Sequence, residues 1–409
     1  HLAYSLTGPA ITSFTQAVVN ARAVFFVSDD TTYVGGAGFT VTLSDGTITT
    51  APTMIGATIV DAQLSVQTAG GFDFDQDNPI TAMGLGIIAD GASDKTFKIE
   101  NQDANRDFTF TGTGFTYAGS GSDMHLTGGI ITAIAETGHG TPPQPAFSRF
   151  DLYVPAVEWM NAVSAAAHGD QSVIETLTRS WTFNFNGNAG PDGFGASNLN
   201  DIFTGNGGDD TFEGDFGYDR AYYGNASAAV NVQLADGFVT GAATGTDTLK
   251  SIELVTGSDF ADLYNAGSTP NNPGGFSAAS TNSGSTVTSN TLGLFNEFAG
   301  RGGDDQIFGN GQTRVSYYHA TSAVTVTFTG WTNAASGSTG FADGDASVGH
   351  DTLSGVNWAR GSFFDDIFHG ATNPSGSTEN FEGLGGDDLI DGGGFDRAVY
   401  IGAFHDTGI

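Results

Sequence analysis

Aspartates recur every nine residues in the middle of this chain, and glycines precede each of them. The regular series is Asp192, Asp201, Asp210 and Asp219. A phenylalanine stands two positions after each of the first three, and Ala221 takes that place after the fourth. Carboxylates that folding brings together repel one another, and a bound divalent cation removes the repulsion. The spacing therefore predicts a row of cation sites.

The elements that would position these aspartates follow from the repeated unit Gly-x-x-Gly-x-Asp-x-apolar-x. Its first six residues predict a tight turn that uses glycine conformations, and its last three predict a short strand with the apolar side chain inward. Two units would make one layer, so Asp192 should stack on Asp210 and Asp201 on Asp219. At the ~4.8 Å spacing of strands, two carboxylates repel by roughly 3.5 kcal/mol at an effective dielectric of about 20. Calcium suits such sites better than magnesium because it accepts about six to eight oxygens, including carbonyls, in flexible geometry.

Two stretches carry a family resemblance, GNAGPDGFG (187–195) and GNGGDDTFE (205–213). They resemble the nonapeptide of the repeats-in-toxin, or hemolysin-type calcium-binding, family. The resemblance implies a parallel β-roll that binds Ca²⁺ between its turns, in secreted bacterial proteins. It also implies that the four aspartates of the series are side-chain ligands. The turn glycines that would supply or flank carbonyl ligands are Gly190, Gly208 and Gly217.

The same phase returns later in the chain, in GRGGDDQIF (300–308) and GLGGDDLI (383–390). The further candidate ligands are Asp262, Asp305, Asp366, Asp388 and Asp396. Inserted segments separate these blocks of repeats. If the layers continue beneath the inserts, Asp262 stacks on Asp305 and Asp366 on Asp388; two separate short rolls are the alternative.

Several positions depart from the pattern and predict weaker or absent sites. Leu199 replaces a turn glycine, and Glu253, Asn296, Asn357 and Glu379 stand where aspartate is expected. After Asp305 the phase falls on Arg314, whose guanidinium could pair carboxylates directly, or on Thr313 if one residue is deleted.

The composition predicts an all-β protein of several domains. Residues 1–150 alternate in hydrophobicity and predict a β-sandwich-like domain. Residues 151–181 predict a connector of two short helices, with Trp159, Met160 and Val163 on one apolar face and Asp170 as the N-cap of the second helix. Three calcium-binding blocks follow, at 182–265, 266–370 and, truncated, 371–409.

The net charge of −33, with three lysines and nine arginines, disfavours nucleic acid and anionic membranes as partners and favours divalent cations. There is no cysteine, and no apolar run long enough to span a bilayer. GFDFDQDN (71–78) is interpreted as a solvated turn rather than a calcium loop, and Trp331 is expected to be the most exposed tryptophan.

Catalytic motifs are sparse. No HExxH and no G-x-S-x-G occurs, which disfavours the secreted metalloproteases and lipases that often carry calcium repeats. The favoured hypothesis is a secreted structural or adhesive protein of the bacterial cell surface or matrix, with calcium, other copies of itself or glycans as partners. The alternative is a secreted carbohydrate-active enzyme or sugar-binding module that carries the repeats as a folding aid.

Overall fold

The computed structural model describes most of the chain from residue 61 to 399. The described ranges are 2–3, 25–26, 36–41, 53–58, 61–66, 79–89, 91–101, 106–138, 145–150, 152, 154–178, 181–195, 199–273, 275–277, 294–331, 337–374, 377–394 and 396–399. The chain divides into two compact units, residues 1–60 with 401–409, and residues 61–400. In the first unit β1 (Leu2–Ala3) pairs with β2 (Phe25–Phe26), and β3 (Gly36–Val41) pairs with β4 (Thr53–Thr58). The stretch 71–78 lies outside the described residues.

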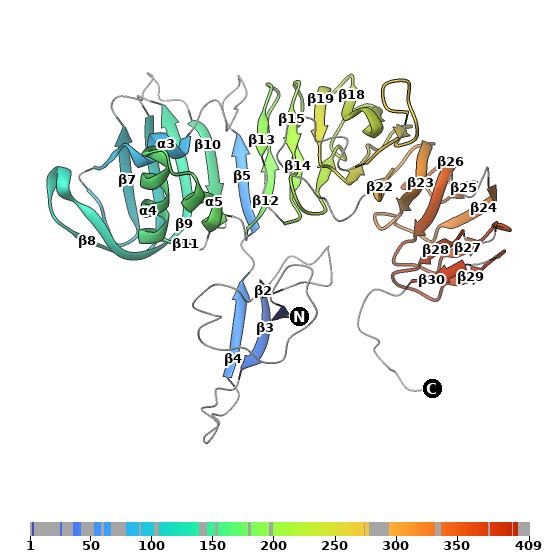
Figure 1. Cartoon of the computed structure of the whole chain (residues 1–409), viewed down its shortest axis with the longest axis horizontal. Coiled ribbons are helices and arrows are strands. Elements are labelled where there is room, and N and C mark those ends of the chain that lie inside the picture. Colours follow the sequence, from blue (N-terminus) through green and yellow to red (C-terminus); the bar gives the residue numbers. More distant parts are fainter. Residues whose placement is uncertain are drawn as a thin grey trace. The chain divides into compact units, whose positions relative to one another are not determined.

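The second unit begins with one antiparallel sheet (Figure 1). Its strands, in spatial order, are β6 (Ile87–Ile88), β7 (Thr96–Asn101), β8 (Arg106–Ala118), β9 (His125–Gly138), β10 (Pro145–Phe150) and β5 (Asp61–Val66). Burial alternates along β7, as expected for a sheet with one covered face. In the described part of residues 61–150 there is no second sheet. The predicted sandwich is replaced there by a sheet covered with helices.

Those helices are α3 (Pro79–Gly84), α4 (Ala156–Ala167) and α5 (Ser172–Thr178). The two predicted near residues 157–181 are confirmed, with Trp159 and Val163 buried. The Asp170 carboxylate accepts the Ser172 N–H at 3.2 Å, which is a capping bond at the start of α5. However, α4 packs on α3 and β9, so it belongs to the first sheet and is not a separate connector. No helix in the described ranges is long and apolar enough to cross a membrane.

From residue 182 the strands run in two ladders built mainly from parallel pairs. The first ladder is β13 (Gly193–Gly195), β15 (Thr211–Glu213), β19 (Gly245–Lys250), β18 (Phe238–Gly241), β17 (Val230–Gln233), β21 (Leu263–Asn265), the first half of β23 (Gln306–Ser316), the first half of β26 (His350–Arg360), β25 (Ser338–Asp343), β24 (Thr325–Trp331), β27 (Ile367–His369) and β29 (Leu389–Asp391).

The second ladder starts from β5 and extends the first sheet. Its members are β12 (Thr182–Asn186), β14 (Ile202–Thr204), β16 (Arg220–Tyr222), β20 (Leu254–Thr256), β22 (Asn296–Ala299), the second halves of β23 and β26, β28 (Glu379–Glu382) and β30 (Asp396–Ala398). The protein is therefore predominantly β, as the sequence predicts.

The apolar residues of the nine-residue unit fill the space between the ladders. Phe194, Phe203 and Phe212 are buried, and the Phe203 and Phe212 rings stack at 5.3 Å between centroids. Phe185 lies 5.1 Å from Phe203 and continues the stack toward β12. Inward alternation of these side chains, one per short strand, confirms the predicted period.

The inserts do not divide the ladders into separate pieces. β20 pairs with β22 and β21 with β23, which joins the first block to the second, and β26–β28 and β27–β29 join the second to the third. The two inserts add the hairpins β17–β18 and β24–β25 to the first ladder. The alternative of separate short rolls is therefore wrong for the described residues.

Candidate metal-binding turns

The predicted aspartates lie at the ends of turns, directly before the strands of the two ladders. Seven of them are at most 3% exposed: Asp192, Asp201, Asp210, Asp219, Asp262, Asp305 and Asp366. Asp388 and Asp396 are half-buried. A carboxylate that leaves water in this way needs hydrogen bonds or a counter-charge.

Stacking of the aspartates occurs as predicted. The Asp192 N–H donates to Asp210 Oδ1 at 2.8 Å, and the Asp201 N–H donates to Asp219 Oδ1 at 2.8 Å. The same bond joins later pairs, from the Asp262 N–H to Asp305 at 2.7 Å and from the Asp366 N–H to Asp388 at 3.0 Å. A backbone N–H therefore faces Oδ1 of each accepting carboxylate, that is of Asp210, Asp219, Asp305 and Asp388.

The second oxygen, Oδ2, lies against the glycine five residues earlier. A methyl group added at Gly205 would overlap Asp210 Oδ2, and one at Gly300 would overlap Asp305 Oδ2. The same overlap occurs at Gly187, Gly257, Gly361 and Gly383 with their own aspartates. Glycine begins the unit because the carboxylate occupies the space of a Cβ.

Two kinds of turn differ in what Oδ2 contacts. In the closed turns, 187–192, 257–262 and 361–366, the N–H four residues before the aspartate donates to Oδ2. In the open turns, 205–210, 214–219, 300–305 and 383–388, that residue has a positive φ. The φ values there are 72° for Asn206, 58° for Asp215, 70° for Arg301 and 72° for Leu384.

As a consequence, three carboxylate oxygens in the open turns lack a hydrogen-bond partner among the described residues. The Oδ2 atoms of Asp210, Asp219 and Asp305 are buried and have no hydrogen-bond partner within the described part of the chain. Burial raises the pKa of Asp210 to about 8, and the charges of Asp247 and Asp192 add to the effect. Burial also raises the pKa of Asp219 and of Asp305, which further carboxylates nearby push higher. These three groups resist ionisation unless a cation is present.

Carbonyl oxygens of the neighbouring turn point at the open turns. The Gly190 carbonyl faces Gly208, and the Leu199 carbonyl faces Gly217. Both receiving glycines have positive φ, 108° and 148°, so they lie in turns as predicted. In the same way Gly303 faces the Phe260 carbonyl. An open turn thus combines an unpaired carboxylate oxygen with carbonyls from the turn beside it.

Two further aspartates belong to this row and were missed from the sequence. Asp247 Oδ1 accepts the Asp210 N–H at 3.0 Å, and Asp351 Oδ1 accepts the Asp305 N–H at 2.9 Å. Burial raises the pKa of Asp247 to about 6. Each of these aspartates begins the sequence Asp-Thr-Leu, which follows an insert. The nine-residue spacing does not reach them, because a hairpin precedes each one.

The row of turn residues along the second ladder continues from Asp219 to Glu253, whose side chain accepts the Asp219 N–H at 3.0 Å, and loses its carboxylates after that. Thr313, not Arg314, continues the row, because Asn296 pairs with Thr313 and Glu297 with Arg314. The Thr313 hydroxyl donates to Asn296 Oδ1 at 2.9 Å, so neutral hydrogen bonds replace the carboxylates. The interpretation with a one-residue deletion, which places Thr313 in the row, is therefore confirmed.

At the end of the chain, Asp396 pairs with Glu379 across β28 and β30, and its Oδ1 accepts the Asn373 amide at 3.1 Å. The Trp331 indole, predicted to be exposed, is half-buried and donates to Glu379 at 3.1 Å.

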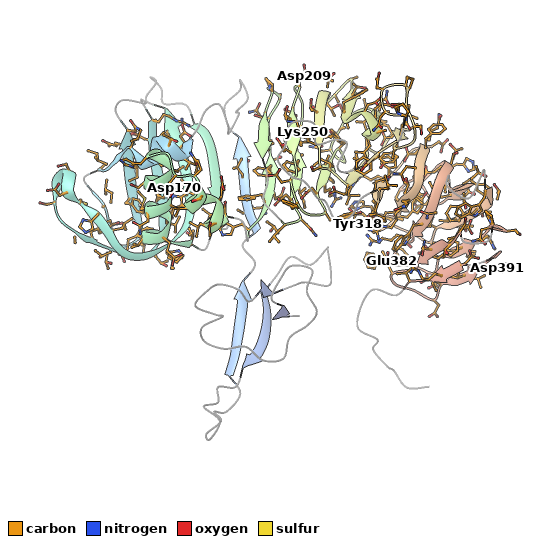
Figure 2. All side chains as sticks on the ribbon, viewed as in Figure 1. Asp170, Asp209, Lys250, Tyr318, Glu382 and Asp391 are labelled. Carbon is orange, nitrogen blue, oxygen red and sulfur yellow. The ribbon has the colours of Figure 1, made fainter. Side chains whose placement is uncertain are left out.

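The described side chains contain no group of three or more His, Cys, Asp or Glu that could hold a metal ion. A cation in an open turn would therefore take most of its oxygens from the backbone. Figure 2 labels Asp209, the exposed neighbour of Asp210 in one such turn. No protein-family model matches the sequence, and no curated protein matches it.

Proposed function

We propose that this protein is a secreted calcium-binding structural or adhesive protein in which residues 182–399 form an interrupted parallel β-roll. One observation carries the proposal: the buried, unpartnered Oδ2 atoms of Asp210, Asp219 and Asp305, each in a turn with positive-φ backbone. A buried carboxylate oxygen without a partner costs about 1–3 kcal/mol or more, so the turn is incomplete without a proton or a cation.

The donor set fits calcium. All side-chain donors in the open turns are carboxylates, the remaining donors are carbonyls, and the chain has no cysteine. Oxygen ligands in a flexible turn suit Ca²⁺, whereas Zn²⁺ prefers nitrogen and sulfur and Mg²⁺ needs rigid octahedral geometry. Asp210, Asp219 and Asp305 would each hold an ion together with carbonyls of the adjoining turn. The ion would neutralise the buried carboxylates and tie neighbouring turns together.

A structural or adhesive role is supported by the way the ladders end. Within the described part of the chain, β29 and β30 each pair on one side only. An unpaired strand edge can add a strand from another copy. Calcium-dependent ordering of the last turn, 383–388, would then control whether that edge is presented.

The test is a calcium titration of the full chain, with magnesium as control, followed by circular dichroism and light scattering. The triple variant Asp210→Asn, Asp219→Asn, Asp305→Asn is compared with the exposed control pair Asp209→Asn, Asp304→Asn. We expect calcium, but not magnesium, to increase β structure in the wild type and control, with a weaker response in the triple variant. An equal response in all three proteins, or none in the wild type, would overturn the calcium assignment. Growth in particle size with calcium supports assembly, and folding without growth removes it.

A further inference from the structure

The arginines of residues 199–399 gather on one side of the second ladder. Ala221 is buried in the middle of β16, so its neighbours Arg220 and Tyr222 point away from the core. The same outward row continues through Arg314 in β23 and Arg397 in β30. We call this outward side of the second ladder the arginine face. In a chain with net charge −33, such clustering of scarce positive charges requires an explanation.

The arginine face lies on the inner side of a curve. From β15 the first ladder runs through β19, β18, β17, β21, β23, β26, β25, β24 and β27 to β29, whereas from β16 the second runs through β20, β22, β23, β26 and β28 to β30. The two hairpins therefore make the first ladder longer by four strands, or ~19 Å at ~4.8 Å per strand. Because the two ladders share one core, the stack must bend toward the second ladder, which crowds side chains on the arginine face.

Most of these arginines are already neutralised. Arg314 and Arg360 both pair with Glu297 and Glu382, and all four side chains are buried. Burial alone would raise the pKa of Glu297, but the charges of Arg314 and Arg360 lower it. Arg301 pairs with Asp259 at 2.8 Å.

Arg220 is different, because it contacts no carboxylate among the described residues. Its Nε donates to Thr256 Oγ1 at 2.8 Å, and its Nη2 lies 3.1 Å from His319 Nε2. Burial and the charges of Arg220 and Arg301 lower the pKa of His319 to about 4, so the imidazole is neutral at pH 7. Among the described residues, Nη1 of this guanidinium has no acceptor.

Two aromatic rings flank this guanidinium. Its Cζ lies 5.2 Å from the Tyr222 ring centroid and 5.6 Å from that of Tyr318. Arg301 Nη1 donates to the Tyr222 hydroxyl at 3.4 Å and brings a second positive charge nearby. Tyr222, Tyr318 and His319 are all half-buried, so each keeps an accessible part (Figure 2 labels Tyr318). Stacking on tyrosine fixes the guanidinium plane in advance of binding.

We propose that Arg220, Tyr222 and Tyr318 bind a carboxylate-bearing sugar residue of a glycan. The Nη1 group of Arg220 donates a charge-assisted hydrogen bond to a carboxylate, and tyrosine rings offer flat apolar surface to a sugar ring. The net charge of the chain repels long polyanions, so the expected ligand is a short acidic oligosaccharide, which brings few negative charges to the surface. This inference rests on the proposed function, because Asp219, directly before Arg220, belongs to a calcium turn that positions β16.

The test is calorimetric titration of the calcium-loaded full chain with trigalacturonate, and with maltotriose as the neutral probe. We expect Arg220→Gln to weaken trigalacturonate binding at least tenfold. We expect Arg397→Gln, which removes an exposed arginine of the same face, to leave binding unchanged, and maltotriose to bind much more weakly. Tyr318→Ala, which removes one flanking ring, is expected to weaken trigalacturonate binding too. If Arg220→Gln does not fold, the comparison of Tyr318→Ala with the wild type tests the proposal instead.

Equal binding by the wild type and by the folded variants, or equal binding of maltotriose, overturns the proposal. The proposal is also overturned if no sugar binds and the wild type self-associates in a way that Arg220→Gln abolishes. The arginine face would then contact a second copy of the chain. Calcium binding is titrated separately in every variant. Its loss in the wild type contradicts the proposed function, whereas normal calcium binding without sugar binding contradicts this inference alone.

Discussion

Calcium binding to the open turns should release protons at pH 7. The pKa of Asp210 is about 8 in the metal-free fold, so this carboxyl is about nine-tenths protonated at pH 7 and must lose its proton to bind a cation. Asp219 and Asp305 have raised pKa values for the same reason, which is burial without a partner for Oδ2. The turns of Asp210, Asp219 and Asp305 should therefore release close to one proton each, or about three in total.

The same linkage sets the pH dependence of stability without metal. The folded pKa of Asp210 lies above its ordinary 3.8, so its contribution is fully present below about pH 4 and is lost as the pH rises through 8. Four pH units at ~1.4 kcal/mol each give at most about 6 kcal/mol, which solvent near the turn reduces to about 3 kcal/mol. Calcium should reverse this trend, because its affinity rises about tenfold per pH unit up to pH 8.

The assay is calorimetric titration with calcium at pH 7 in two buffers of different ionisation enthalpy, which gives the number of protons released. Asp210→Asn should remove about one proton from the total, and Asp209→Asn, at the exposed neighbouring position, should remove none. Calcium binding without proton release would show that these carboxylates are charged in the metal-free protein. That result would refute the reasoning from burial.

Three further predictions concern stability with calcium saturating. Glu297→Gln should lower the free energy of unfolding by about 3–5 kcal/mol in urea titrations because it leaves Arg314 buried without its full partner, and adding Arg314→Gln should restore part of that loss. Gly205→Ala should cost about 1–3 kcal/mol and weaken calcium binding because its methyl group overlaps a carboxylate, whereas Gly195→Ala, with open space around it, should cost less; equal losses would contradict the overlap. Thr313→Val should cost about 1–3 kcal/mol in thermal unfolding because the Asn310 N–H loses its acceptor and Asn296 Oδ1 loses one of its two donors, and an unchanged midpoint would contradict that role.

The first ladder could be read from the sequence wherever the nine-residue phase is unbroken. Glycine, aspartate and phenylalanine each have one position in the unit, and the structure gives each a distinct reason: space for a carboxylate, acceptance of an N–H, and filling of the core. The stacking of Asp262 on Asp305 across an insert was predictable on the same basis, because register is fixed by which residue must point inward.

The distinction between open and closed turns was not predictable. Asn188 and Asn206 stand at equivalent places in their turns, yet one donates to the carboxylate and the other has a positive φ of 72°. The difference depends on the glycine two positions later, since Gly208 also has positive φ and together these residues turn the N–H away. Phe260 and Phe364 stand at that place in the other two closed turns, so only the turn with Gly190 has the sequence of an open turn and a closed conformation.

The ion pairs between residues far apart in the sequence were also not predictable from the sequence. They show which part of the ladders does not depend on calcium for its pairing. Asp305, in the first ladder's row, is followed in the neighbouring strand by Asp351, so that row keeps its carboxylates. The second ladder's row keeps its carboxylates through Glu253 and then has Asn296 and Thr313 instead, while its outer side gains the buried pairs of Arg314 and Arg360. Those ion pairs stay formed without any metal. Withdrawal of calcium should therefore loosen the turns that contain Asp210, Asp219 and Asp305, while the part of the second ladder from β22 to β28 stays paired, so the two edges of these later layers differ in their dependence on calcium.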